Sequence, residues 1–86
     1  MSKIEKLLKR FLLKPKDFTY AELRKLLTAY GYEEISKGKT AGSRVAFVDR
    51  KTRHIIRLHR PHPEPELKQY QMQDIIDELK KTGRIP

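Results

Sequence analysis

Apolar residues recur along the first part of this chain with the spacing of an amphipathic helix. Ile4, Leu7, Leu8, Phe11 and Leu12 lie three or four positions apart, which predicts a helix over residues 3–13. A proline disfavours helical backbone in the residue before it, so Pro15 should end this helix.

A second stripe of the same period predicts a helix over residues 20–30. Thr19 precedes this stripe and Glu22 stands three residues later, the pattern of a capping box that closes a helix N-terminus. Gly31 follows the last apolar position and can adopt the left-handed conformation that ends a helix. The apolar positions are Tyr20, Leu23, Leu26, Leu27 and Tyr30.

The period then changes from that of a helix to that of strands, with candidates at 32–36, 43–49 and 54–59. Residues 37–42 form a basic turn with two glycines, and 50–53 a polar turn. Side chains alternate between the two faces of a strand, so each of the two longer segments has an apolar and a mixed face. The apolar face carries Val45, Phe47, Ile56 and Leu58, and the other carries Arg44, Ala46, Val48, Ile55, Arg57 and His59.

A final helix is predicted over residues 70–81, after a connector stiffened by Pro61, Pro63 and Pro65. The order α-α-β-β-β-α predicts an α+β fold with a three-stranded antiparallel sheet. Helices 20–30 and 70–81 should cover one face of the sheet and leave the other free. We expect a single domain over residues 1–86, with 1–16 as a helical extension whose docking position the pattern does not give.

Composition narrows the class of protein. The 86 residues include no cysteine, which excludes disulfides, thiolate zinc sites and cysteine nucleophiles, and which fits a cytoplasmic protein. No apolar run approaches the roughly 20 residues of a membrane span, so no membrane association is expected.

Positive charge is concentrated in the strand region. The net charge is +9, and residues 36–60 alone carry +7 because Asp49 is the only acid among eight bases. Such concentration favours a polyanionic partner, above all a nucleic acid, over a basic surface that serves only solubility. The candidate phosphate-binding and base-stacking residues are Lys37, Lys39, Arg44, Arg57, Arg60, Lys68 and Tyr70.

The three histidines, His54, His59 and His62, all lie beside these arginines. RNA can be cleaved without metal when its 2′-hydroxyl attacks the adjacent phosphate, assisted by a general base, a general acid and cations. Histidine suits both proton roles and arginine suits charge stabilisation. His54 falls on the inward face and is expected to be structural, whereas His59 and His62 are the candidates for proton transfer.

Metal and cofactor chemistry is disfavoured. A zinc site on His59 and His62 lacks a third ligand at suitable spacing. A magnesium-dependent nuclease needs clustered carboxylates, and the basic segment holds only Asp49. No glycine-rich phosphate motif occurs, so we expect no metal and no cofactor.

Three segments in order resemble the HicA toxin family over about residues 18–81. They are FTYAELRKLLTAYGYEE at 18–34, GSRVAF at 42–47 and HRPHPEPELKQYQMQDIIDEL at 59–79. The resemblance implies the α-β-β-β-α fold of double-stranded-RNA-binding domains. It also implies cleavage of mRNA and neutralisation by a HicB-type antitoxin.

The family's catalytic histidine follows Gly-Ser, and Arg44 occupies that position here. Arginine stays charged near neutral pH and cannot act as a general base. Either His59 or His62 then moves the proton while Arg44 stabilises the phosphate, or the protein binds RNA without cutting it. A protein-interaction module with an acidic partner is the third interpretation.

Overall fold

The computed structural model describes residues 3–35, 44–61 and 64–85. In chain order, the elements in this part of the chain are α1 (Lys3–Leu12), α2 (Tyr20–Ala29), β1 (Glu33–Ile35), β2 (Arg44–Asp49), β3 (His54–His59) and α3 (Gln69–Lys81). The predicted elements are all present, with ends that differ by one or two residues. The predicted α+β fold with a three-stranded antiparallel sheet is confirmed.

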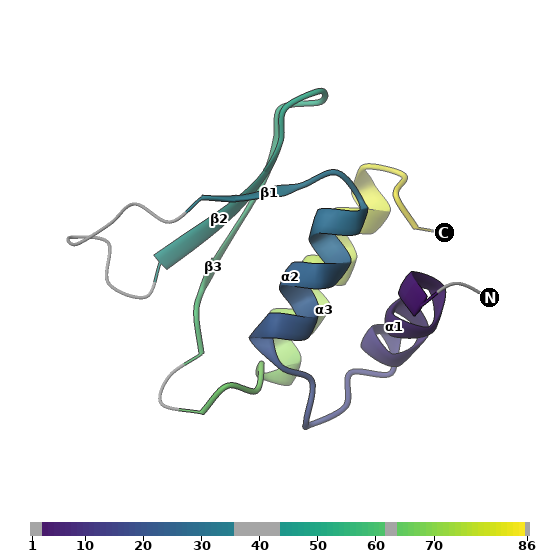
Figure 1. Cartoon of the computed structure of the whole chain (residues 1–86), viewed down its shortest axis with the longest axis vertical. Coiled ribbons are helices and arrows are strands. Elements are labelled where there is room, and N and C mark those ends of the chain that lie inside the picture. Colours follow the sequence, from purple (N-terminus) through teal and green to yellow (C-terminus); the bar gives the residue numbers. More distant parts are fainter. Residues whose placement is uncertain (1–2, 36–43, 62–63, 86) are drawn as a thin grey trace.

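The sheet has the order β1-β2-β3, and both neighbouring pairs are antiparallel. Helices α2 and α3 cover one face of it, and the other face is open (Figure 1). Val45, Phe47 and Ile56 are buried under the helices, whereas Arg44 and Arg57 on the opposite face are exposed. The alternation predicted from the sequence therefore places the arginines on the open face.

Helix α2 begins and ends as its sequence predicts. The Thr19 side chain accepts a hydrogen bond from the Glu22 amide, and the Glu22 carboxylate accepts one from the Thr19 amide. Gly31 has a φ of +95°, the left-handed conformation that a residue with a side chain rarely adopts. The chain can therefore turn directly from α2 into β1.

Helix α1 docks on α2 and α3, on the side of these helices away from the sheet (Figure 1). Phe11 is completely buried, and its ring centroid lies 5.0 Å from that of Phe18. Beside this contact, Nε of Arg10 lies 3.0 Å from a carboxylate oxygen of Glu22. Ile4, Leu7 and Leu8 also pack against the core, so these contacts together fix the position of α1 that the sequence left open.

The C-terminal segment is tied to the far end of the β2–β3 hairpin. The guanidinium of Arg84 forms an ion pair with buried Asp49, donates a 2.6 Å hydrogen bond to the Tyr30 carbonyl, and lies 4.9 Å from the ring centroid of Tyr32. Asp49 also accepts hydrogen bonds from the amides of Lys51 and Thr52, which shapes the hairpin turn. One buried carboxylate thus joins the turn to the segment after α3.

We expect Phe11→Ala to lower the free energy of unfolding by about 3–5 kcal/mol, because it leaves a cavity between α1 and the rest of the core. Urea denaturation measures this value. The matched control is Leu13→Ala, since Leu13 is 81% exposed and its truncation should cost less than about 0.5 kcal/mol. Equal losses in the two variants would show that α1 does not contribute to the core.

Candidate nucleic-acid interface

Three of the predicted site residues meet on the open face of the sheet. Arg44 on β2 lies directly opposite His59 on β3, and Arg57 is opposite Ala46, two residues further along. Directly opposed residues of an antiparallel pair have Cβ atoms about 5 Å apart. All three side chains are exposed. Two arginines and an imidazole therefore share one solvent-facing surface.

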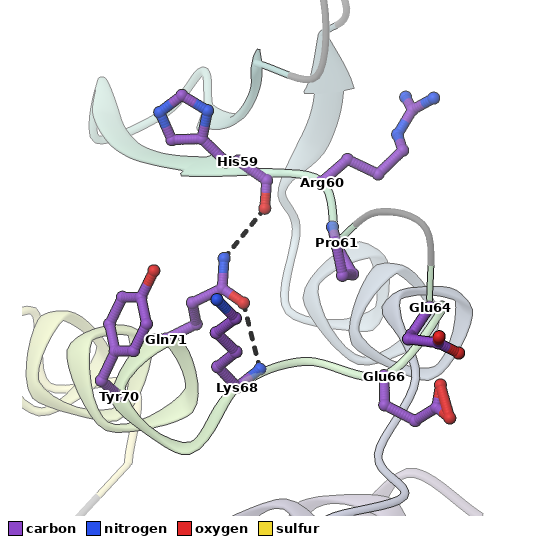
Figure 2. A pocket seen from close by; sticks show the side chains of 8 residues that line it. All are labelled: His59, Arg60, Pro61, Glu64, Glu66, Lys68, Tyr70 and Gln71. Carbon is purple, nitrogen blue, oxygen red and sulfur yellow. Dashed lines mark hydrogen bonds between the residues drawn. The ribbon is translucent and has the colours of Figure 1, made fainter.

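A hollow of about 470 Å³ adjoins this surface, between the end of β3 and the start of α3 (Figure 2). Among its lining residues are the predicted contacts His59, Lys68 and Tyr70. Tyr70 is 62% exposed, and its ring points toward the end of β3 in Figure 2. Lys68 is the N-cap residue that precedes α3, so backbone N–H groups of the first turn of α3 lie beside the hollow.

Gln71 holds the two sides of this hollow together. Its side-chain amide donates a 2.9 Å hydrogen bond to the carbonyl of His59, and its side-chain oxygen accepts a 3.1 Å hydrogen bond from the amide of Lys68 (Figure 2). Gln71 is only 8% exposed. A buried amide thus fixes the end of β3 against the first turn of α3. Within its own helix Gln71 looks like any polar position, so the sequence pattern did not single it out.

Arg60 points away from the other cations of the site. In Figure 2 the side chain of Arg60 extends from the end of β3 in a different direction from that of His59. Its guanidinium lies 5.3 Å from the ring centroid of Tyr20 and 4.0 Å from a carboxylate oxygen of Glu34. The Tyr20 hydroxyl donates a hydrogen bond to the same carboxylate, and burial together with this contact raises the pKa of Tyr20. Arg60 therefore lines the hollow together with His59, but its guanidinium is held by Tyr20 and Glu34.

Two carboxylates also line the hollow, Glu64 and Glu66. One oxygen of Glu66 is buried without a hydrogen-bond partner in the described part of the chain. Among the residues described, no group of three or more histidine and acidic side chains could hold a metal ion. The hollow is therefore mixed in charge, with Arg60 and Lys68 as cationic side chains and Glu64 and Glu66 as carboxylates.

His54 lies on the helix-covered face, as its position in the alternation predicts. Its Nδ1 is 2.7 Å from the hydroxyl oxygen of Tyr32, and its Nε2 is 3.0 Å from a carboxylate oxygen of Glu78 on α3. The hydrogen bond from His54 holds the pKa of Glu78 below its usual range, with a smaller contribution from Lys81. Both ring nitrogens are engaged inside the fold, so His54 links the sheet to α3.

Three further predicted residues, Lys37, Lys39 and His62, lie outside the described residues. Their expected roles in phosphate binding and proton transfer stay predictions.

The fold and the site define a small α+β protein with one open, basic sheet face. A model of the family described as the HicA toxin of bacterial toxin-antitoxin systems matches residues 20–83, from the start of α2 to just beyond α3. The chain therefore belongs to the HicA toxin family, is the toxin of a toxin-antitoxin pair, and has an antitoxin as its partner. No curated protein and no solved structure matches it.

The matched range does not include α1, the helix that carries the buried Phe11. None of the helices in the described ranges is both long and apolar enough to cross a lipid bilayer.

We expect Gln71→Leu to destabilise the protein by about 1–3 kcal/mol, because it leaves the His59 carbonyl and the Lys68 amide unpaired. Urea denaturation measures the loss, and the NMR signals of the His59 ring report its altered position. The matched control is Gln69→Leu, since the side chain of exposed Gln69 donates a 3.2 Å hydrogen bond to the carbonyl of Lys14, its one such bond among the described residues. Unchanged His59 signals in Gln71→Leu would contradict the positioning role.

The lowered pKa of Glu78 predicts a pH-dependent contribution to stability. The pKa of the Glu78 carboxyl is lower in the folded than in the unfolded chain, where it has its ordinary value of 4.5. The ionised carboxyl therefore stabilises the fold at pH values above 4.5, and this contribution disappears as the pH falls through the folded-state pKa. The difference in unfolding free energy between the unmodified chain and Glu78→Gln should therefore be largest near neutral pH and shrink below about pH 4.5. Urea denaturation across this range, with Asp74→Asn as the control on α3, measures it. A difference that grows in acid would reverse the predicted sign.

Proposed function

We propose that this toxin binds mRNA on the open sheet face and cleaves it without a metal ion, and that a HicB-type antitoxin neutralises it in the cytoplasm. The observation that carries the proposal is the direct opposition of Arg44 and His59 on adjacent strands, with Arg57 on the same face. This arrangement offers two guanidinium cations and one imidazole, the side chain that most often serves in general acid–base catalysis.

The chemistry needs three contributions from these residues. Arg44 and Arg57 bind the scissile phosphate and stabilise the charge that develops on its oxygens. His59 takes the proton from the 2′-hydroxyl or returns one to the leaving oxygen, and His62 is the candidate for the complementary proton transfer. Lys37, Lys39 and Lys68 bind neighbouring phosphates, and Tyr70 provides an exposed ring on which a base can stack.

A second function is an RNA-binding protein that does not cut. The observation that favours it is Arg44 at the position where the family's histidine follows Gly-Ser, because arginine cannot accept a proton there. In that case the same surface holds RNA through its phosphates and 2′-hydroxyls alone.

Incubation of the purified chain with RNA in excess EDTA tests the first function. We expect cleavage that His59→Ala slows by about 10²–10⁴-fold, the usual range for losing a general acid or base. RNA affinity should change little, since His59 contributes mainly to the reaction. Product analysis by denaturing gel measures the rate.

The control is Lys80→Ala, which removes an exposed cation near the opposite end of α3 and should leave cleavage unchanged. Salt-dependent binding without any product would support the second function instead. The absence of measurable RNA binding at physiological salt would contradict both functions.

A further inference from the structure

The hollow between the end of β3 and the start of α3 is lined by side chains of both charges. Its carboxylates are Glu64 and Glu66, and its cations are Arg60 and Lys68 (Figure 2). The volume of about 470 Å³ lies within the range of small-molecule clefts, roughly 300–1,000 Å³. The cations disfavour a metal ion and favour an anionic group, whereas a carboxylate needs hydrogen-bond donors. The hollow therefore fits a ligand that carries both an anionic group and N–H donors.

Glu66 is held at the edge of this hollow by its backbone. It forms a single antiparallel bridge with Thr19, the residue that caps α2. Beside the bridge, the amide of Leu67 donates a 2.8 Å hydrogen bond to the carbonyl of Phe18. Leu67 and Phe18 both belong to the buried core. The core therefore sets the place from which the Glu66 side chain reaches the hollow.

The Glu66 carboxylate can accept more hydrogen bonds than the described part of the chain supplies. One of its oxygens is buried with no hydrogen-bond partner among the described residues. A buried acceptor without a donor costs free energy, which a donor on a ligand would recover. Glu64 is exposed, so water can satisfy its oxygens. Of the two carboxylates, Glu66 therefore gains more from a ligand that donates hydrogen bonds.

Among the four RNA nucleotides, that of guanine matches these requirements best. Unpaired RNA bases are recognised through hydrogen bonds along their Watson–Crick edges. The edge of guanine presents two adjacent donors, N1–H and the 2-amino group, which match the two oxygens of a carboxylate. Adenine and cytosine present one amino group beside an unprotonated ring nitrogen, which a carboxylate repels. Uracil presents one N–H between two carbonyl oxygens, so a carboxylate selects guanine.

We propose that the hollow binds a guanine base of the RNA and that Glu66 determines this specificity. The two N–H groups of the base donate to the Glu66 carboxylate, and exposed Lys68 binds a phosphate beside it. This inference rests on the proposed function, because RNA is the source of the base. His59 also lines the hollow, so a guanine bound here brings its own ribose and phosphate toward His59. Cleavage should then occur beside guanines.

Mononucleotides test the base preference apart from the rest of the RNA. We expect the 86-residue chain to bind GMP about tenfold more tightly than AMP, a factor within the range of a bidentate contact to a base. IMP lacks the 2-amino group and keeps one of the two donors, so its affinity should fall between these values. NMR titrations measure the three affinities, and the side-chain amide of Gln71 at the hollow should shift on binding.

Two matched variants test the role of Glu66. Glu66→Gln keeps the shape of the side chain but leaves one acceptor oxygen, so the preference for GMP over AMP should fall below about twofold. Glu64→Gln removes the other carboxylate of the hollow and should keep the preference. Urea denaturation confirms that each variant is folded, and the comparison of GMP with IMP decides the question on the unmodified chain if Glu66→Gln does not fold.

The outcomes separate the guanine site from the proposed function. Equal affinities for GMP, IMP and AMP, a preference that survives Glu66→Gln, or an equal loss in both variants would overturn the guanine site. If the chain prefers GMP but neither binds nor cleaves RNA, the proposed function fails and the guanine site stands. If RNA is cleaved equally at all four bases and GMP is not preferred, the proposed function stands and the guanine site fails.

Discussion

Burial of every second side chain of β2 and β3 against α2 and α3 determines where the charged groups of this protein lie. Val45, Phe47 and Ile56 supply much of the apolar area that the sheet removes from water. A shift of one residue in β2 would expose Val45 and Phe47 and bury Arg44, and the same shift in β3 would expose Ile56 and bury Arg57. The cost of burying an unpaired guanidinium makes this register strongly preferred. The site is thus held in place by the core beneath it.

The elements and their faces could be predicted because each depends on local information. The capping box at Thr19 and Glu22, the left-handed Gly31 and the period of two in β2 and β3 all lie within a few residues of the structure they determine. The same alternation placed Arg44, Arg57 and His59 together and assigned His54 to the inner face. Agreement between these signals is what made the predicted fold correct.

What could not be predicted depends on contacts between distant segments. Arg60 adjoins His59 in the sequence, but its guanidinium lies beside the ring of Tyr20 and a carboxylate oxygen of Glu34. Gln71 bonds to the His59 carbonyl, twelve residues away, and Arg84 pairs with Asp49 across almost half of the chain. A single sequence has no signal for such pairs, because nothing in their spacing distinguishes them from exposed polar residues.

Under the proposed function, Arg44 at the position expected for the family's histidine determines which residues can act on RNA. A permanent charge at the edge of the sheet binds phosphate more firmly than a neutral imidazole does, but it leaves proton transfer to neighbouring groups. In the proposed function the proton-transfer role therefore falls to His59, the imidazole that the strand register sets directly opposite Arg44.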